Sequence, residues 1–398
     1  MTDAVSALSR STGATPSIPV EPSISPVFFE RERDKVFRRT WLKLARVAEI
    51  PNVGDFVVRE VEVLNASVLI VRNEAGQIRA YHNVCPHRGN RLANQCEGKA
   101  RAFTCSFHGW SFDLQGRLRY VHDEASFCGL DKSATGLVPV NHEEWMGFIF
   151  VNFNKEPHES LKEYLGDVAS LTEGYPHAEM VRVGHYRAIV KCNWKTIQDA
   201  FSEAYHVQIV HRRSLPDLRK ELIPRKLARF GRHGNMSATM SVKRDPSPTE
   251  RAIWSRSTGF MRSGTNSGLP AGLNRDRQPN WAFDQFVLFP NLNLILGNGW
   301  STTHEYWPIS VDETRWEASY YASNATSPVA CIANEFFKVR VRDTVREDLS
   351  TIESAHAGQK SGVISRLLLS SHEDLLAHHR DVLNVYMTAD SSEGGPHS

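Results

Sequence analysis

Apolar and polar residues alternate over short runs between about Val47 and about Asn154, and this alternation predicts a domain of antiparallel strands. Residues 67–72 and 77–81 are strand-like runs on either side of the turn Asn73-Glu-Ala-Gly76, which is a hairpin signal. Residues 111–114 and 117–120 flank the pair Gln115-Gly116 in the same way. A last apolar run, residues 145–153, ends this region.

The apolar pattern changes on both sides of this region. Residues 27–42 carry Phe28, Phe29, Val36, Phe37 and Trp41 as an apolar stripe, which predicts a helix. From about residue 157 onward, helical patterns and longer strands mix, which predicts an α+β domain with helices backing a curved antiparallel sheet.

The expected organisation therefore has four parts. They are a disordered tail at 1–24, an N-terminal helix at 25–46 that packs on the C-terminal domain, an antiparallel β domain at 47–156 and the α+β domain at 157–398. Within the last part, residues 229–279 are poor in large apolar side chains. A surface insertion and a lid over a site are equal alternatives for that segment.

Composition narrows the classes of protein. The chain has 398 residues, 41% of them hydrophobic, which is enough to fill two domain cores. The formal net charge is +2 with both signs mixed, which argues against binding to nucleic acid or to an anionic membrane. No apolar run is long enough to span a bilayer, and the Ser-, Thr-, Ala- and Pro-rich start lacks the pattern of a secretory signal.

Two short segments each pair a cysteine with a histidine: Cys85-Pro-His87 and Cys105-Ser-Phe-His108. A two-iron, two-sulfur cluster of mixed ligation needs two thiolates on one iron and two imidazoles on the other. Two similar loops can hold such a cluster from opposite sides, and the neighbouring glycines suit tight loops. A zinc site is the alternative, although zinc motifs usually group their cysteines and their histidines separately.

A second group of candidate ligands lies in the helical stretch 193–211. His206 and His211 follow the carboxylates Asp199 and Glu203. Non-haem Fe(II) oxygenases bind iron through two histidines and one carboxylate. Residues five apart on a regular α-helix point about 140° apart, so these histidines share a metal only if the helix forms a π-turn or breaks. Two buried, hydrogen-bonded histidines are the alternative for this motif alone.

Taken together, the two motifs resemble the catalytic alpha subunit of the Rieske non-haem iron oxygenases, and the resemblance extends from about Phe28 to about Met387. It implies a Rieske [2Fe–2S] domain at 47–156 and a helix-grip-like catalytic domain with a mononuclear Fe(II) at 157–398. The implied cluster ligands are Cys85, His87, Cys105 and His108. The implied iron ligands are His206, His211 and a carboxylate near the C-terminus, for which Asp348 stands at the matching place and Glu347 and Asp343 are alternatives.

Two positions depart from the commonest pattern of the family. The family usually has Asp three residues before the first iron histidine, where it bridges to a Rieske histidine of the neighbouring subunit. Glu203 keeps the carboxylate on a longer arm, as in some demethylating and amine-oxidising members. The family often has Asn where this chain has Asp199, so Asp199 is a candidate catalytic carboxylate that either faces the metal, turns away or is protonated.

The resemblance also implies partners. The sequence has no nicotinamide or flavin fingerprint, so electrons are expected from a separate reductase, directly or through a ferredoxin. A homotrimer is expected, in which His108 of one chain faces Glu203 of the next. The cysteines outside the cluster motif have no disulfide spacing, which favours the cytoplasm.

Of the properties predicted from the sequence, the identity of the substrate is the least well determined. Phe286, Leu294 and Trp307 are candidates for an apolar pocket lining, although each of them also fits a role in the core. An apolar compound, aromatic or polycyclic, is expected, and a methylated or quaternary amine is the alternative because aromatic walls also bind cations. Monooxygenation and dioxygenation both remain open. An electron-transfer Rieske protein without oxygenase activity is the alternative from another class.

Overall fold

A computed structural model describes residues 16–214, 224–239, 248, 251–252 and 268–389. The chain forms two compact units. The smaller is Phe37–Tyr164, and the larger combines the segment up to Val36 with the residues from Leu165 onward. The domain limits expected from the sequence, at 46/47 and 156/157, differ from these by several residues and stay predictions.

The N-terminal segment contains more structure than the sequence indicated. Residues 16–24, expected in a disordered tail, include β1 (Ser17–Pro19) and α2 (Glu21–Ile24). β1 pairs antiparallel with β19 (Arg366–Leu368). A strand whose hydrogen-bond partner lies at the far end of the chain leaves no local pattern in the sequence. Residues 1–15 of the expected tail lie outside the described residues.

The expected helix at 27–42 is shorter than predicted. It consists of α3 (Pro26–Glu32) followed by the π-helical turn η1 (Arg33–Phe37). Ser25 caps it, because its side chain accepts a hydrogen bond from the N–H of Phe28 (3.2 Å). The chain then turns into a strand that begins at Leu42.

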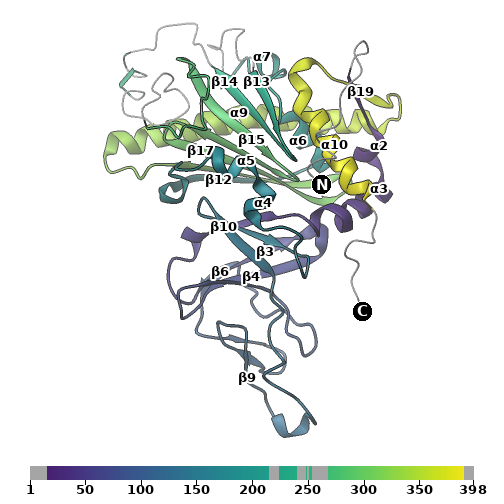
Figure 1. Ribbon diagram of the computed structural model, residues 1–398, viewed down its shortest axis with the longest axis vertical. Helices are drawn as coiled ribbons and strands as arrows, with labels where there is room; N and C mark the ends of the chain where they lie inside the picture. Colours follow the sequence, from purple (N-terminus) through teal and green to yellow (C-terminus); the bar gives the residue numbers. More distant parts are fainter. Residues whose placement is uncertain (1–15, 215–223, 240–247, 249–250, 253–267, 390–398) are drawn as a thin grey trace. The chain divides into compact units, whose positions relative to one another are not determined.

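The smaller unit consists of antiparallel sheets, as the alternation predicted. Its sheets have the strand orders β10-β11-β2, β5-β4-β3-β6 and β7-β8-β9 (Figure 1). The strands are β2 (Leu42–Arg46), β3 (Asp55–Val61), β4 (Ala66–Arg72), β5 (Ile78–His82), β6 (Glu97–Lys99), β7 (Phe103–Thr104), β8 (Ser111–Phe112), β9 (Leu118–Tyr120), β10 (Asn141–Trp145) and β11 (Phe148–Asn152). Short 3-10 turns are η2 (Val47–Glu49), η3 (Glu62–Leu64) and η4 (Glu124–Ser126).

The core of the smaller unit supports the cysteine–histidine loops. Cys85 and Cys105 are buried in one apolar cluster with Phe56, Phe103 and Trp110. The Phe56 and Phe103 rings meet edge to face at 5.3 Å. The two loops are therefore anchored by their cysteines on a packed core, and packed cores restrict movement of the groups within them.

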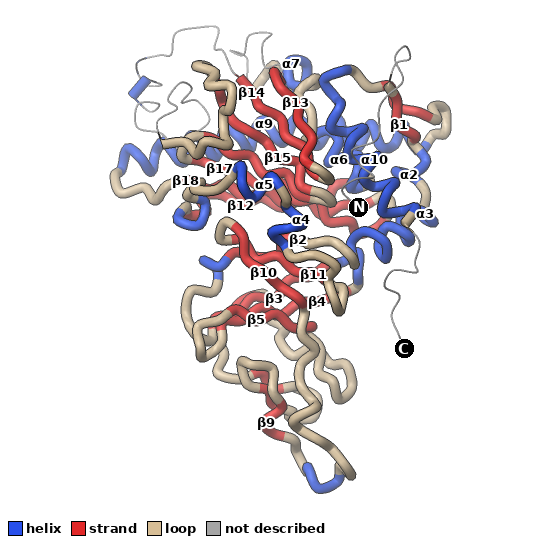
Figure 2. Tube along the Cα trace, viewed as in Figure 1, coloured by secondary structure: helices blue, strands red, loops and turns tan. Residues whose placement is uncertain are grey.

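The larger unit is built on a seven-stranded antiparallel sheet with the order β12-β18-β17-β16-β15-β14-β13. Helix α9 crosses one face of this sheet (Figures 1 and 2). The strands are β12 (Val181–Val190), β13 (Pro224–Phe230), β14 (His233–Thr239), β15 (Trp281–Leu288), β16 (Leu292–Gly297), β17 (Trp300–Ser310) and β18 (Glu313–Ala322). The helices of the larger unit are α5 (Asp167–Leu171), η5 (His177–Glu179), α6 (Trp194–Ala200), α7 (Val207–Val210), α9 (Pro328–Lys360), η6 (Ser371–Glu373) and α10 (Asp374–Thr388), and α4 (Leu161–Leu165) lies at the boundary with the smaller unit.

The segment 229–279 is only partly an insertion. Its first residues complete β13 and form β14, which pairs with β15 inside the sheet. Most of residues 240–267 lie outside the described part of the chain, so the alternatives of insertion and lid stay predictions there.

A buried ion pair joins the N-terminal segment to α6. Lys195 Nζ lies 2.6 Å from Glu32 Oε1, and both side chains are fully buried. Trp194 Nε1 donates to the other oxygen of Glu32 (3.1 Å). Removing one partner would leave an uncompensated charge in the core, which typically costs about 3–5 kcal/mol. The pair therefore fixes the helix that leads into the histidine motif.

The described residues contain no helix that combines the length and the apolar character needed to cross a membrane.

His379 on α10 makes the stability of the larger unit depend on pH. The ring is buried, and its Nε2 lies 2.9 Å from the carbonyl oxygen of Pro290. Burial, with the nearby charge of Arg380, lowers the pKa of His379 to about 3. Below its ordinary pKa of 6.5 the unfolded chain therefore binds a proton that the folded chain does not. The free energy of unfolding falls as the pH drops below 6.5, by up to about 1.4 kcal/mol per pH unit from this group.

We predict that His379→Gln, whose amide can still donate to Pro290, reduces this acid sensitivity. Its thermal midpoint, followed by circular dichroism, should fall less than that of the wild type between about pH 6.5 and about pH 5. His372→Gln, at a partly exposed position just before α10, serves as the control and should keep the wild-type slope. Equal slopes for the wild type and His379→Gln would contradict the prediction.

Candidate metal centres and pocket

Two loops of the smaller unit present Cys85 and Cys105 in equivalent ways. In both loops the cysteine N–H donates to the carbonyl five residues further on (2.8 Å). The N–H groups of Gly89 and Gly109 donate back to the carbonyl of the same cysteine (2.9 and 3.0 Å). Both glycines have a positive φ, +75° and +73°, which glycine adopts without strain. The glycine next to each cysteine–histidine pair is therefore required by the turn.

Both cysteine thiols, of Cys85 and Cys105, are buried. They lie within hydrogen-bonding reach of each other, and backbone N–H groups point at each of them. Burial raises the pKa of Cys85. Burial also acts against ionisation of Cys105, but the N–H groups of Phe107 and His108 outweigh it and lower the pKa of that thiol. The thiolate is the form in which cysteine binds metal.

The histidines complete the donor set. The ring centroids of His87 and His108 are 4.7 Å apart, and His87 stacks on Trp110. Among the described residues, Nδ1 of His108 is buried and has no hydrogen-bond partner. A buried ring nitrogen in this state is available as a metal ligand. Two thiols and two imidazoles on paired loops fit a mixed-ligand [2Fe–2S] cluster.

In the larger unit His206 and His211 stand at the two ends of one short helix. His206 precedes α7 as its N-cap, and His211 follows it as its C-cap. The stretch between the two histidines is the four-residue helix α7 itself, so the described backbone has neither a π-turn nor a break between them, and the break lies before His206, between α6 and α7. The ring centroids of the two histidines lie 5.2 Å apart. Helix ends, rather than a bulge, turn the two rings toward each other.

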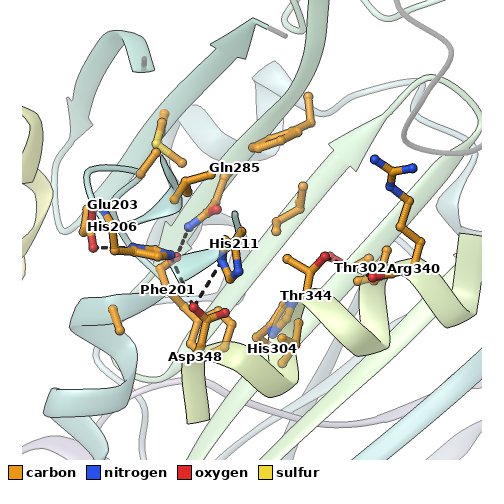
Figure 3. A pocket seen from close by; sticks show the side chains of 18 of the residues that line it. Phe201, Glu203, His206, His211, Gln285, Thr302, His304, Arg340, Thr344 and Asp348 are labelled. Atoms are coloured by element: carbon orange, nitrogen blue, oxygen red, sulfur yellow. Dashed lines mark hydrogen bonds and ion pairs between the residues drawn. The ribbon is translucent and has the colours of Figure 1, made fainter. Parts of the chain in front are cut away.

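Asp348 on α9 provides the third donor. Its Oδ1 lies 3.4 Å from Nε2 of His206 and 3.2 Å from Nε2 of His211. The three donor atoms all lie within 4.8 Å of one another, and within the described part of the chain this is the single group of three metal-binding side chains so arranged (Figure 3). Two imidazoles and one carboxylate fit a mononuclear Fe(II) site with open positions.

Glu347 and Asp343, the two alternative candidates for the third ligand, make other interactions. Glu347 Oε2 lies 3.1 Å from Nδ1 of His211, on the side of the ring away from Asp348. It also accepts a hydrogen bond from Ser214. Asp343 pairs with Arg342 (2.8 Å). The geometry therefore favours Asp348 as the ligand.

Glu203 holds His206 in the way that Glu347 holds His211. Its Oε1 lies 2.5 Å from Nδ1 of His206, and its other oxygen accepts the N–H groups of Tyr205 and His206. Burial acts to lower the pKa of His206, but the hydrogen bond and charge of Glu203 and the charge of Asp348 outweigh it and raise the pKa. A carboxylate behind a ligating imidazole fixes the tautomer and leaves Nε2 for the metal.

Asp199 does not belong to this group. It turns away from the histidines and forms an ion pair with Arg380 (2.5 Å). Burial raises the pKa of Asp199 to about 6, against the opposing charges of Arg380 and Lys195. Asp199 is also absent from the lining of the pocket described below, so of the alternatives open for this residue the structure favours the one in which it turns away.

A pocket of about 820 Å³, counting the solvent at its mouth, opens beside the three ligands. One cross-strand row of the sheet forms part of its wall. Met236, Gln285, Ile295 and Thr302 stand opposite one another on β14, β15, β16 and β17 and all line the pocket. Phe201, Phe283, Trp300 and residues of α9 supply other parts of the wall.

The three side chains expected in the lining are elsewhere. Phe286 and Leu294 pair one position beyond the lining row, and a shift of one residue in a strand turns the side chain to the other face. Phe286 instead lines a small separate cavity. Trp307 is buried and is likewise absent from the pocket lining. The alternation showed that these segments are strands but not which face carries the pocket.

Five polar lining residues were not anticipated: Gln285, Thr302, His304, Arg340 and Thr344. Thr302 and His304 occupy alternate positions of β17 and are buried. Burial lowers the pKa of His304 to about 3, so its ring is neutral at ordinary pH. Polar residues at alternate positions of a strand are the sequence signal that indicates such a lining. Arg340 offered no such signal, because charged residues are frequent along α9.

Comparison with known proteins gives matches over both units. A family model described as "Ring hydroxylating alpha subunit (catalytic domain)" matches residues 177–389. A model described as "Rieske [2Fe-2S] domain" matches residues 40–133, which agrees with a [2Fe–2S] cluster rather than zinc.

Individual relatives fall into two groups. The chain is 28% identical over 340 residues to the carnitine monooxygenase oxygenase subunit of Escherichia coli (strain K12). The aligned region covers 84% of this chain and 81% of that protein. It is 38% identical over 194 residues to the large oxygenase component of the naphthalene 1,2-dioxygenase system of Pseudomonas aeruginosa. Here the aligned region covers 47% of this chain and 42% of that protein.

Solved structures share the fold. A quaternary ammonium Rieske monooxygenase in complex with L-carnitine has a TM-score of 0.74 at 21% identity and covers 94% of this chain and 96% of that chain. Naphthalene 1,2-dioxygenase from Rhodococcus sp. bound to indole has a TM-score of 0.75 at 22% identity, with 94% and 95% covered.

We predict that His206→Ala, His211→Ala and Asp348→Ala each lose mononuclear iron and keep the visible spectrum of the cluster, because each change removes one of three donors. Iron content and absorption spectra measure this. Asp343→Asn is the matched control on the same helix and should retain iron. If Asp348→Ala binds iron as the wild type does, Glu347 becomes the candidate ligand.

A second expectation concerns the cluster. In His108→Cys a thiolate would add negative charge where a neutral imidazole stood, so the reduction potential should fall by roughly 100 mV or more if the cluster assembles. His122→Gln, an exposed position in the same unit, is the control. Voltammetry of both variants measures the potential, and an unchanged value in a cluster-bearing His108→Cys would argue against His108 as a ligand.

Proposed function

Because the chain belongs to the family of ring-hydroxylating oxygenase alpha subunits, we propose that it hydroxylates an apolar, aromatic or polycyclic substrate with O2. It is a terminal oxygenase component and uses electrons from a separate reductase or ferredoxin. The single observation that carries the proposal is the group His206, His211 and Asp348 at the wall of a largely apolar pocket. We place this reaction in the cytoplasm, since none of the six cysteines, all of which lie in the described part of the chain, forms a disulfide.

The two metal centres divide the chemistry. Cys85, His87, Cys105 and His108 would hold the [2Fe–2S] cluster, and His206, His211 and Asp348 would hold the mononuclear iron. When bound, the cluster supplies single electrons and the mononuclear iron supplies a site for O2.

The residues around the iron ligands keep the site in one arrangement. Glu203 and Glu347 hold the two imidazoles with Nε2 directed inward. Gln285 and Asn293 both donate to the carbonyl of Phe201, Asn293 at 2.9 Å, which ties the loop between α6 and α7 to the sheet. Hydrogen bonds of this kind orient ligands before any substrate enters.

Monooxygenation of a methylated or quaternary amine, including N- or O-demethylation, is the second candidate. The relatives that act on carnitine favour it, as does Glu203. The pocket offers Phe201, Phe283 and Trp300, whose ring faces can bind a cation. An electron carrier without oxygenase activity is disfavoured, because such a carrier has no use for the three-ligand group.

We further infer a homotrimer in which His108 of one chain faces Glu203 of the next. Tyr205, two residues after Glu203, and Ile209 on α7 are 64% and 74% exposed, which is unusual for large apolar side chains. In the other unit Phe107, next to His108, is 54% exposed. Exposed apolar side chains at two different places on one chain are consistent with a head-to-tail contact, in which one place on a chain meets the other place on its neighbour. A closed ring of subunits satisfies every such contact.

Oxygen uptake tests the proposed activity. Purified enzyme with a generic reductase is offered naphthalene, biphenyl, trimethylphenylammonium and L-carnitine in turn, with His211→Ala as the inactive control. Uptake coupled to a hydroxylated aromatic product supports the proposal, and uptake with trimethylamine or formaldehyde release supports the second candidate. Reduction of the cluster without oxygen uptake on any compound would leave the electron carrier as the better description.

Glu203→Gln tests the link between the subunits. The neutral amide should preserve both metal centres and the trimer but slow oxygenation by about 10- to 100-fold, because the link between two imidazoles loses its charge. Glu203→Asp should retain part of the activity if a shorter arm still reaches. Sedimentation and single-turnover oxidation of the reduced cluster are the measurements. An unimpaired single turnover in Glu203→Gln, or a fully active monomer, would refute the trimer and its bridge.

A further inference from the structure

Two polar side chains of β17 line the pocket beside the iron ligands without a hydrogen-bond partner. Thr302 and His304 are 2% and 3% exposed. Among the described residues, the hydroxyl oxygen of Thr302 and Nδ1 of His304 are buried and make no hydrogen bond. Buried polar groups are normally paired, because an unmade hydrogen bond is costly once water is excluded. These two atoms therefore point to a group that the chain itself does not supply.

The other polar side chains of the lining are engaged within the protein. Gln285 donates to a backbone carbonyl of the loop between α6 and α7. The hydroxyl of Thr344 donates to the carbonyl of Arg340, one turn earlier on α9 (3.0 Å). Arg340 itself interacts with another group of the protein. Glu203 and Asp348 lie against the histidines of the iron site.

The ring of His304 is packed between aromatic side chains. Its centroid lies 5.0 Å from that of Phe201 and 5.9 Å from that of Trp316. Burial lowers the pKa of His304 to about 3, so the imidazole is uncharged at ordinary pH. An uncharged imidazole has one N–H donor and one acceptor nitrogen. His304 can therefore offer a substrate a hydrogen bond but no charge.

The strand brings the two polar groups within reach of one substrate atom. Thr302 and His304 are two positions apart on β17, so their side chains leave the same face, with Cα atoms about 7 Å apart. Two donors that each lie about 2.8 Å from one shared oxygen are at most about 5.6 Å from each other. The spacing of the two residues permits this, so a hydroxyl and an imidazole can converge on one oxygen.

His304 is the member of the pair nearer to the iron ligands. Tyr306 follows it on the same face of β17, and the pKa of Tyr306 is raised by burial and, to a smaller extent, by the charge of Asp348. This end of the strand is therefore the end close to Asp348. Figure 3 shows the same order, with His304 on the Asp348 side of Thr302. A group bound between the two side chains lies beside the position where the substrate is oxidised.

Resting on the proposed function, we propose that Thr302 and His304 bind an uncharged oxygen of the substrate, which is then an apolar ring compound that carries a carbonyl or a hydroxyl group. A carbonyl oxygen accepts a hydrogen bond from both side chains, whereas a hydroxyl accepts from one and donates to the other. Because the oxygen is held in one place, the same part of the ring is always turned toward the iron ligands. The pair thus selects the substrate and sets the position of oxidation.

The proposal separates compounds that share one ring system. A plain hydrocarbon leaves both polar groups unpaired when it displaces water, and sites built to form hydrogen bonds reject analogues of this kind. An ammonium ion brings a charge for which Thr302 and His304 offer no opposite charge. A ketone or an alcohol satisfies both side chains.

Isothermal titration of the oxidised full-length protein tests this with tetralin, 1-tetralone, 1-tetralol and 1-aminotetralin, which share one bicyclic body. The measured quantity is the ratio of the dissociation constant of tetralin to that of the ketone or the alcohol. In the wild type this ratio should exceed one. A high ratio for the ketone alone identifies a carbonyl, and a high ratio for the alcohol alone identifies a hydroxyl. The amine should bind more weakly than the preferred oxygen compound.

Variants assign the preference to its residues. Thr302→Val and His304→Phe each remove one hydrogen-bonding group, so each should lower the ratio by about 5- to 10-fold, as expected for one hydrogen bond. Thr302→Ser keeps the hydroxyl and should keep the ratio. Thr344→Val is the matched control, because the hydroxyl of Thr344 already donates within α9. Circular dichroism and iron content check that each variant is folded.

A ratio at or below one for both oxygen compounds in the wild type would overturn the proposal. A ratio that persists in both Thr302→Val and His304→Phe, or the amine as the tightest ligand, would do the same. The proposed function fails separately. If a ketone or an alcohol binds through these side chains but no compound causes reductase-driven oxygen uptake, the subsite stands and the oxygenase assignment is wrong. If tetralin is oxidised and the ratio does not depend on either side chain, the oxygenase stands and the subsite is wrong.

Discussion

The buried carboxylate of Asp348 is the group on which the arrangement of the larger unit depends. It is 5% exposed and lies against two imidazoles, each of which has a further carboxylate on its outer nitrogen. Without a cation, so many acidic groups in one buried place would be unfavourable. A divalent metal at the centre reverses that balance. The position of α9 across the sheet, and with it the wall of the pocket, follows from the need to bring this one carboxylate to the two histidines.

In both units hydrogen bonds hold the candidate metal ligands in place, although the groups that make these bonds differ. In the smaller unit two tight turns with glycine at positive φ direct backbone N–H groups at two buried sulfurs. In the larger unit a four-residue helix carries a histidine at each end, and side-chain carboxylates replace the N–H groups. Both arrangements place donors on short segments that are anchored in a packed core or an ion pair. Preorganised donors need little rearrangement when a cofactor binds.

Local chemistry could be predicted from the sequence, whereas contacts made over long distances could not. Cys85 and His87, or His206 and His211, are close in the chain, so their pairing could be predicted from their spacing, although the helix break or π-turn expected between the two histidines is absent. Asp348 was identified only through the resemblance to a family, because nothing near it marks it among the other acids of α9. The pocket was placed on the wrong face of β15 and β16, since alternation does not say which face is covered. The ion pair of Asp199 with Arg380 and the pairing of β1 with β19 could not be predicted either, because each joins residues far apart in the sequence.

The most direct test of the account is the metal and sulfide content of the purified protein. The central claim is that one chain holds both a mixed-ligand cluster and a separate iron bound by His206, His211 and Asp348. Iron and acid-labile sulfide, measured per chain on anaerobically purified protein, should then stand at about three to two. A ratio of about two to two would leave the larger unit without its iron, and zinc without sulfide would contradict both centres.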